Sequence, residues 1–488
     1  MSGRVASQVL RRMAAVPGRG EALLATAVLL LTAALAFAPL VTLLVLLAAA
    51  GVWTLVRVPY AIPLALIVLM GNVKVNWYLG FFTLFPEYLV LMVACGLGFI
   101  VWLQRPAWPP ERRLVILFMV WIATGLLSVP FALSASKVLA RVVLMGVSLV
   151  TLVSVLATVN TWPRLLRAVA VWEVVATLYA GFGIVQMVGM VVGFDTTPHF
   201  LEGIANPDMY LGVGSPVRRR IGDVFRANSM FNDPNILGGF LAAAMVAMLA
   251  LRMHHAATGR RGRAAAELAA LGVMAVCLLL TQSRSGFLAL LAGSAVVFAH
   301  RPAALRRPGL WWALAACVVA MFGAAMLVGV DPTLLPSRFA GIGDVTDTSN
   351  RQHLEVFLYG LQLVARFPLT GVGLGNFGLY YGAERDAWFT NMMSHSAPLS
   401  AFAESGLPGG IAFLLLWVHV LRRIGRKPAE GDPQANTLYV ALLASVVALL
   451  VANLFYDYLL RTFVWVIVGV ALSAARLAAP AREPRGAA

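Results

Sequence analysis

The sequence predicts an all-α, polytopic integral membrane protein: a helical bundle of about fourteen transmembrane helices with two long outer loops. Three observations support this fold class. Hydrophobic residues make up 60% of the 488 positions and charged residues only 12%, about half the charged share of a soluble domain. Apolar segments long enough to span a bilayer recur along the whole chain, and basic residues collect between alternate segments.

Fourteen apolar segments are long enough to cross a membrane. Their centres lie near Leu29, Leu46, Leu66, Val93, Met119, Leu149, Tyr179, Met245, Met274, Leu290, Val319, Phe413, Val447 and Ile467. The first follows an arginine-containing stretch that resembles the start of a signal peptide. The apolar stretch runs on to about Trp53 without a convincing cleavage site, so we expect uncleaved helices.

The basic residues predict the orientation of these spans. The chain has 37 Lys+Arg against 21 Asp+Glu, a net charge of +16. With the N-terminus inside, 24 of the basic residues fall in inner loops and tails, which leaves 37 − 24 = 13 outside or at the outer membrane edge. This sorting predicts that both termini are cytoplasmic. The positive charge is then mostly a topology signal, so we expect no nucleic-acid partner.

The two long outer loops divide the chain. We expect seven N-terminal transmembrane helices over residues 1–193, a first outer loop over 194–233, and four helices over 234–329. A large outer loop over 330–396 follows, then three helices over 397–477 and a tail over 478–488. The three cysteines lie in apolar runs and predict neither a disulfide nor a metal site.

Within the large outer loop, Arg351–Arg366 has the spacing of an amphipathic helix, and we expect it to lie on the membrane surface. The apolar residues at this spacing are Leu354, Phe357, Leu358 and Leu361. Pro368 ends the predicted helix, and the glycine-rich run Gly371–Asn376 follows.

Arginines on the predicted outer face are the first candidate functional residues. Arg220 and Arg226 belong to a local cluster in the first outer loop, and Arg284 occupies a tight hairpin between the ninth and tenth spans. An arginine at the bilayer edge is costly unless it snorkels to lipid headgroups or meets an anion. For each arginine taken alone, snorkelling or pairing with a nearby acidic residue is a sufficient explanation. Together, Arg226 and Arg284 fit a lipid-linked diphosphate, because guanidinium groups make bidentate contacts with its oxygens.

His395 is the second candidate, at the entrance to the twelfth span. A neutral imidazole there could take a proton from a hydroxyl group, although a histidine that only anchors a helix end is equally consistent with the spacing. Glu404 follows nine residues later on the same helix, either as part of the site or as a packing or capping carboxylate. The sequence has no carboxylate pair spaced for glycoside hydrolysis, no glycine-rich phosphate-binding loop with lysine and no clustered His/Cys metal ligands, so we expect no cofactor.

Four motifs together resemble the O-antigen ligase and polymerase superfamily. Phe225–Gly238 is similar to its Arg-x-x-Gly-x-Phe-x-x-Pro-Asn signature, and Leu280–Gly286 to its Thr-x-Ser-Arg-x-Gly turn. Pro368–Phe377 resembles its Pro-x-x-Gly-x-Gly-x-Gly-x-Phe element, and His395–Gly406 its His-Asn-x-x-Leu-x-x-x-x-Glu-x-Gly element. The motifs occur in the family order.

Two positions depart from these motifs. Ser229 stands where the family favours glycine, which questions the local backbone shape. Ser396 stands where asparagine often follows the histidine, which weakens the match around the expected base.

The resemblance implies a metal-independent, inverting glycosyltransferase of the bacterial inner membrane with its active site on the periplasmic side. Such enzymes move a glycan from undecaprenyl diphosphate to an acceptor hydroxyl of a glycan or a lipid A core. Catalytic roles would fall to His395, which activates the acceptor, and to Arg226 and Arg284, which stabilise the diphosphate. The substrate-binding residues expected from the resemblance and the outer-face positions are Arg220, Asn235, Arg351, Asn376 and Glu404.

The motifs leave the type of transfer open. A ligase to a lipid A core, a polymerase of O-antigen or exopolysaccharide and a protein O-oligosaccharyltransferase share them, and the fourteen spans favour a polymerase only slightly. A transporter or flippase of a lipid-linked or anionic glycan is the alternative from another class. It would use outer arginines too, but it predicts broken helices and an internal repeat and leaves His395 without a role. A structural scaffold leaves the arginines unexplained.

Overall fold

The computed structural model describes residues 51–69, 77–78, 83–84, 90–96, 111–192, 226–306, 348–385, 393–426 and 433–478, apart from 52, 232 and 459, together with the single residues 315, 319, 323 and 326. The main helices are α4 (Ala61–Val68), α6 (Arg112–Leu127), α7 (Ala135–Thr158), α8 (Trp162–Val191), α9 (Pro234–Ala257), α10 (Arg261–Thr281), α11 (Arg284–His300), α14 (Thr348–Arg366), α15 (Phe377–Arg385), α16 (Ala397–Ile424), α17 (Pro433–Phe455) and α18 (Thr462–Leu477). Short 3-10 helices cover Val129–Phe131 (η1) and Pro302–Arg306 (η3), and the two-residue strands β1 (Trp77–Tyr78) and β2 (Thr83–Leu84) pair antiparallel.

The all-α polytopic membrane fold is confirmed. Within the described ranges, seven helices are long and apolar enough to cross a membrane, and α11 and α18 are shorter apolar helices. These nine match nine of the fourteen expected spans. The spans near Leu29 and Leu46 lie outside the described residues, and those near Leu66, Val93 and Val319 are described only in part, so the count of fourteen stays a prediction.

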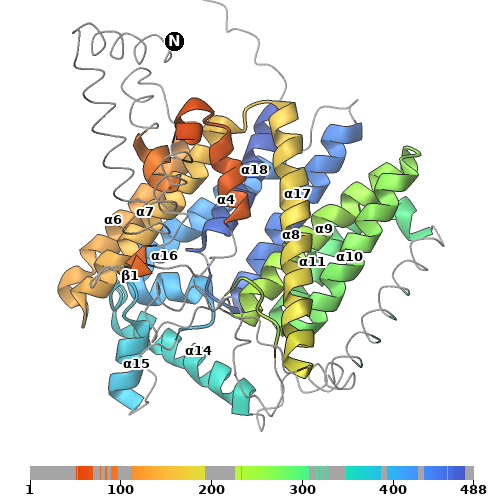
Figure 1. Ribbon diagram of the computed structural model, residues 1–488. Coiled ribbons are helices and arrows are strands. Elements are labelled where there is room, and N and C mark those ends of the chain that lie inside the picture. The colour runs from red at the N-terminus through yellow and green to blue at the C-terminus, as the bar shows by residue number, and fades with distance from the viewer. Residues whose placement is uncertain are drawn as a thin grey trace, which may run out of the picture. The chain divides into compact units, whose positions relative to one another are not determined.

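Helix α9 is the most buried of the described apolar helices that are long enough to cross a membrane, and it packs against α10, α11 and α17 (Figure 1). In its most apolar window 89% of the residues are buried. Its first turn approaches α11 closely because both helices carry glycine there. A Cβ atom on Gly286 would lie 2.9 Å from the backbone carbon of Gly238, closer than real Cβ contacts allow. This approach brings the hairpin between α10 and α11 against the start of α9.

Two helix N-caps lie where α9 and α11 approach each other. The Asp233 carboxylate caps α9 by accepting a hydrogen bond from the Asn235 N–H at 2.7 Å, and Pro234 occupies the first helical turn, where its missing N–H costs nothing. Ser283 caps α11 by accepting from the Gly286 N–H at 3.1 Å. Both caps come from residue types that sequence alone marks as helix starts.

Helix α16 is interrupted at Gly406. Gly406 has φ 68° and ψ −174°, a conformation open mainly to glycine. The break lies against the glycine-rich run, where the Val372 N–H donates to the Ala403 carbonyl at 2.9 Å and the Leu407 N–H donates to the Pro368 carbonyl at 2.7 Å. Backbone groups freed by the break are therefore bonded to the loop that precedes α15.

Helix α14 confirms the helix expected at Arg351–Arg366. Its Val356, Tyr359 and Leu363 are buried in a cluster with Phe377 of α15 and Ala403 of α16. The four apolar residues that the sequence spacing singled out are instead exposed, between 42% and 49%; they are Leu354, Phe357, Leu358 and Leu361. The helix is thus apolar on two faces, of which one packs on the bundle. Contact of the other with lipid stays a prediction.

The helix ends fall into two groups. At one, which we call the motif end, α9, α11 and α16 begin and α10 and α17 finish, and all four sequence motifs have residues there. At the other, the basic end, α9 and α16 finish and α10 and α17 begin. The basic end holds most of the described arginines expected inside, including Arg252, Arg260, Arg261, Arg263, Arg301, Arg422, Arg423 and Arg426. This grouping agrees with the loops that the charge pattern paired.

Candidate active site

Arg226 is a buried arginine at the motif end, 4% exposed. Its Nε donates to the Thr281 carbonyl at 2.7 Å, and its Nη2 donates to the Asn235 Oδ1 at 2.9 Å. The Ala227 N–H also donates to the Leu280 carbonyl at 2.9 Å. Two motifs about 55 residues apart in the chain therefore meet, and Asn235 orients the guanidinium from the first turn of α9.

Ser229 adopts the backbone shape that the family's glycine would allow. Its φ is 50°, in the left-handed region that favours glycine. Three hydrogen bonds to α8 hold it there. Its Oγ donates to the Tyr179 carbonyl at 2.6 Å, its N–H donates to the Gln186 Oε1 at 2.8 Å, and its carbonyl accepts from the Gln186 Nε2 at 3.3 Å. The departure from the motif therefore leaves the turn intact.

Arg284 is the first residue of α11 and reaches towards α14. Its Nη1 donates to the Asn350 Oδ1 at 2.6 Å. Among the residues that the structure describes, no carboxylate lies within 4 Å of its guanidinium nitrogens. Arg351 follows Asn350 and is exposed to its surroundings. The Arg284 charge is thus held by an uncharged amide.

His395 lies in a tight turn before α16. Its φ is 54°, an uncommon conformation for a non-glycine residue and frequent at functional sites. The Ser394 hydroxyl stabilises this turn through the Ser396 N–H at 3.2 Å and the Ser400 hydroxyl at 2.7 Å. The half-buried imidazole lies 4.4 Å from the ring centre of His353 on α14 and 5.6 Å from that of Tyr456 after α17.

A continuous path of contacts joins Arg226 to His395. The Asn235 side chain accepts a hydrogen bond from Arg226, and the Asn235 N–H donates to one oxygen of the Asp233 carboxylate. The Tyr456 hydroxyl donates to the other Asp233 oxygen at 2.8 Å. The Tyr456 ring then contacts the His395 ring. A second path runs through α14, where Asn350 bonds Arg284 and His353, three residues on, contacts His395. The three predicted catalytic side chains therefore gather at the motif end.

Glu404 and Asn376 hold the glycine-rich loop. The buried Glu404 carboxylate accepts from the Gly375 N–H at 2.8 Å and from the Phe377 N–H at 3.4 Å. Asn376 is fully buried; its Oδ1 accepts from the Ser134 N–H at 2.7 Å and its Nδ2 donates to the Ser134 and Leu374 carbonyls. These contacts support a role for Glu404 and Asn376 in packing and in holding the geometry of the loop.

Arg220 lies outside the described residues. The structure adds four residues that the sequence reasoning did not select: Asp233, Asn350, His353 and Tyr456. The ring of His353 contacts that of His395. The three-residue spacing from Asn350 to His353 puts both on one helix face, which was a usable signal. Nothing in the sequence marks Tyr456.

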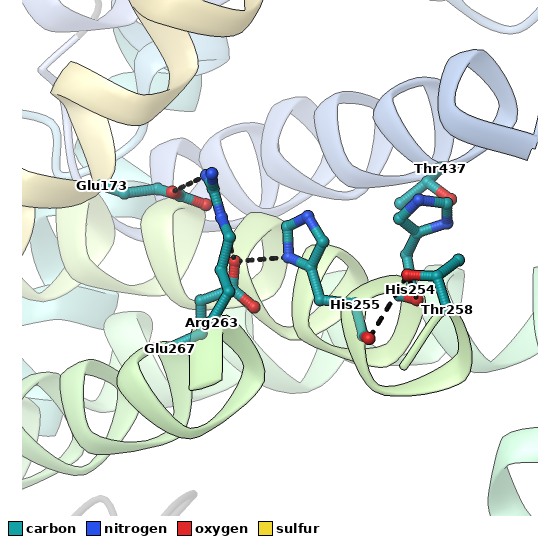
Figure 2. A network of polar contacts seen from close by, with 7 residues as sticks. All are labelled: Glu173, His254, His255, Thr258, Arg263, Glu267 and Thr437. Atoms are coloured by element: carbon teal, nitrogen blue, oxygen red, sulfur yellow. Dashed lines mark hydrogen bonds and ion pairs between the residues drawn. The ribbon is translucent and has the colours of Figure 1, made fainter. Parts of the chain in front are cut away.

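A separate polar cluster lies at the basic end and is shown in Figure 2. Glu267 of α10 accepts from His255 Nδ1 of α9 at 2.7 Å and from Arg263 Nε at 3.4 Å, and Arg263 also lies 3.9 Å from the Glu173 carboxylate of α8. We call these four residues the carboxylate cluster. Within the described part of the chain, no group of three or more His, Cys, Asp or Glu residues is arranged to hold a metal ion.

Comparison with known proteins identifies the segment that contains most of this site. A family model described as O-antigen ligase matches residues 269–414, which include Arg284, Arg351, Asn376, His395 and Glu404. Arg226 and Asn235 lie before the matched segment. No curated protein matches the chain. The match contains three of the four motifs and agrees with the resemblance found in them, and it supports a glycosyltransferase-type enzyme in general. Residues 269–414, about a third of the chain, are thus similar to the O-antigen ligase family.

Proposed function

We propose that the protein transfers a glycan from undecaprenyl diphosphate to an acceptor hydroxyl on the periplasmic face of the bacterial inner membrane. The observation that carries this proposal is the pair of contact paths that bring Arg226, Arg284 and His395 to one end of the bundle. One group that can take a proton then lies at the same end of the bundle as two groups that can bind a diphosphate.

Arg284 and Arg226 bind the diphosphate of the donor. Hydrogen bonds to a backbone carbonyl and to amide oxygens help to orient the two guanidinium groups. An oriented guanidinium in a partly enclosed site stabilises the negative charge that develops on the leaving diphosphate. Asn235 orients Arg226, and Arg220 and the exposed Arg351 contribute charge at the entrance for donor or acceptor.

His395 acts as the general base. The acceptor oxygen forms a bond to the anomeric carbon, the bond from that carbon to the diphosphate oxygen breaks, and the acceptor proton passes to the neutral imidazole. One displacement of this kind inverts the anomeric configuration. The arginines take over the role that a metal has in other diphosphate enzymes, so the reaction needs no metal and no cofactor. Glu404 and Asn376 position the loop beside α16 and support the site indirectly.

The charge distribution supports the periplasmic assignment. Arginines concentrate at the basic end, which the positive-inside rule assigns to the cytoplasm. The motif end then faces the periplasm. There the lipid-linked donor enters the site sideways from the surrounding membrane lipids, and the acceptor approaches from above.

The break in α16 at Gly406 also fits the alternative, a transporter or flippase, because broken helices are typical of transporter sites. In transporters the freed backbone groups point at the substrate. Here the Ala403 and Glu404 carbonyls accept from Val372 and Gly373 of the loop, and the Leu407 N–H donates to Pro368. Hydrogen bonds to the loop therefore account for the break in α16. Glycan transfer also gives His395 a role, which transport does not.

A transfer assay tests the proposal. Purified protein in lipid nanodiscs, given a polyprenyl-diphosphate glycan and a saccharide acceptor in EDTA, should form a glycosidic bond and release polyprenyl diphosphate. His395→Ala should slow transfer by about 100-fold or more while the protein stays folded. Transfer undiminished in His395→Ala, or a strict need for Mg²⁺, would contradict the proposal, and movement of the donor across the bilayer without bond formation would favour the transporter.

A further inference from the structure

The packed face of α14 continues into the candidate active site. Its buried side chains pack against α15 and α16; they are Val356, Tyr359 and Leu363. His353 and Asn350 lie three and six residues before the first of these, a spacing that keeps them on the same helix face. His353 contacts the ring of His395, and Asn350 accepts a hydrogen bond from Arg284. One face of α14 therefore both anchors the helix and touches two of the three predicted catalytic residues.

A glycine holds α14 close to the start of α16. A Cβ atom on Gly360 would lie 2.6 Å from the Leu399 side chain, so the two helices approach more closely there than a larger residue would allow. Leu399 lies in the first turn of α16, four residues after His395. Packing directly beside the site therefore sets the distance between α14 and the His395 turn.

The backbone turn at His395 does not by itself fix the plane of the imidazole. Hydrogen bonds of the Ser394 hydroxyl stabilise the turn, but rotation about the Cβ–Cγ bond of a histidine has only a shallow preference. Ring contacts must then set the plane. The ring of His353 lies 4.4 Å away at an interplanar angle of 62°, and that of Tyr456 lies 5.6 Å away at 48°.

The two ring contacts differ in what else they do. Tyr456 is 4% exposed and its hydroxyl donates to Asp233, so it belongs to the interior of the bundle. The His353 side chain is exposed, so the fold depends on it little. Its ring meets that of His395 edge to face, an arrangement that aromatic pairs prefer. His353 is therefore the contact whose effect on the imidazole can be separated from folding.

We infer that His353 is a positioning residue, whose ring holds the His395 imidazole in the plane from which it takes the acceptor proton. The inference rests on the proposed function and adds to it a second histidine that does not itself take the proton. A general base acts only within hydrogen-bond reach of the proton that it removes. Because α14 also carries Asn350, which bonds Arg284, the same helix sets the base relative to an arginine of the donor site.

The experiment uses the reconstituted full-length protein with a polyprenyl-diphosphate glycan as donor and a saccharide as acceptor. His353→Ala removes the ring, whereas His353→Phe keeps a ring and removes both nitrogen atoms. Gln352→Ala is the matched control, because it makes the same kind of truncation at the neighbouring exposed position of α14. For each protein, kcat, the KM for donor and the rise in melting temperature on adding polyprenyl diphosphate are measured.

The positioning role predicts that His353→Ala lowers kcat by about 10- to 100-fold, the usual cost of a small misplacement of a reacting group. The KM for the donor should stay within about twofold, and the rise in melting temperature should be unchanged. His353→Phe should recover kcat to within about threefold of the unaltered protein, because its ring can make the same edge-to-face contact. A purely structural role would lower the melting temperature and would not produce this division between kcat and KM.

Three results would overturn the inference. An unchanged kcat in His353→Ala would mean that other contacts hold the imidazole. Equal losses of kcat in His353→Ala and His353→Phe would show that a nitrogen atom of His353 is required and that it takes part in the proton transfer. A raised donor KM at unchanged kcat would place His353 in the donor site.

All three results leave the proposed function standing, since the unaltered protein still transfers the glycan. If the unaltered protein forms no glycosidic bond while the donor stays intact, the proposed function fails, and the positioning role fails with it.

Discussion

The two polar clusters at opposite ends of α9 and α10 contain the same kinds of side chain but different partners. In the carboxylate cluster, His255 and Arg263 meet the carboxylates of Glu267 and Glu173 (Figure 2). At the motif end, the described hydrogen bonds of Arg226 and Arg284 go to a carbonyl and two amides. Amides orient a guanidinium without cancelling its charge, whereas carboxylates cancel it. In the carboxylate cluster the positive side chains meet carboxylates, whereas no carboxylate among the described residues lies within 4 Å of Arg284, which suits Arg284 to an anion from outside.

The largest expected difference concerns activity at Arg284. Arg284→Ala should lower kcat/KM for transfer by about 100- to 1000-fold, the usual cost of losing a group that stabilises a developing anion. Arg263→Gln in the carboxylate cluster should change it by less than about threefold, because that side chain is 53% exposed and far from the chemistry. Initial rates in nanodiscs measure both. Equal losses in the two variants would erase the distinction between the clusters.

Stability should respond in the opposite way. Glu267→Ala leaves the buried His255 without its carboxylate and should lower the free energy of unfolding by about 3 kcal/mol. Arg284→Ala removes a charge whose described partner is an amide and should cost about 1 kcal/mol. Thermal denaturation in detergent compares them. A larger loss in Arg284→Ala would show that the motif-end arginine is structural.

Glu404 provides an intermediate test, because it is a motif residue whose contacts are with the backbone. Glu404→Ala removes the acceptor for the Gly375 and Phe377 N–H groups and should cost about 2 kcal/mol, while Glu404→Gln keeps one carbonyl oxygen and should cost about half as much. Thermal denaturation again provides the measurement. If Glu404→Gln is fully stable yet inactive, the carboxylate has a direct chemical role.

The smallest effect concerns pH at α14 and α15. Burial, and then the neighbouring Glu355 carboxylate that accepts its hydrogen bond, raise the pKa of Tyr381 above its usual 10.0. The unfolded state therefore loses this proton first, so stability falls as pH rises above about 10. Tyr381→Phe should show a shallower fall between about pH 9 and pH 11. Identical melting profiles in both proteins would contradict this.

Much of the site could be predicted from local sequence. The Asp-Pro-Asn start of α9 and the Ser-Arg-x-Gly start of α11 are capping patterns, so the positions of Asn235 and Arg284 at helix ends follow from residue type. Arginine sorting predicted which loops share an end. His395 was predicted at a helix entrance and lies in a tight turn immediately before α16.

The rest depended on contacts between distant segments. The partnership of Arg284 with Asn350 joins residues 66 positions apart, and that of Asp233 with Tyr456 joins residues 223 apart. No local pattern specifies such pairs. Helix α14 shows the same limit, since both of its faces are apolar and only packing decides which is buried. Ser229 shows that hydrogen bonds to α8 can hold a left-handed turn without glycine.

The central claim is that the motif-end arginines bind a lipid diphosphate, and direct binding of polyprenyl diphosphate without its glycan tests this most directly. Titration of the unaltered protein in nanodiscs should give saturable binding that Arg284→Ala weakens by about tenfold or more and that Arg263→Gln leaves unchanged. Equal affinity in Arg284→Ala and the unaltered protein, or an equal loss in Arg263→Gln, would contradict the account.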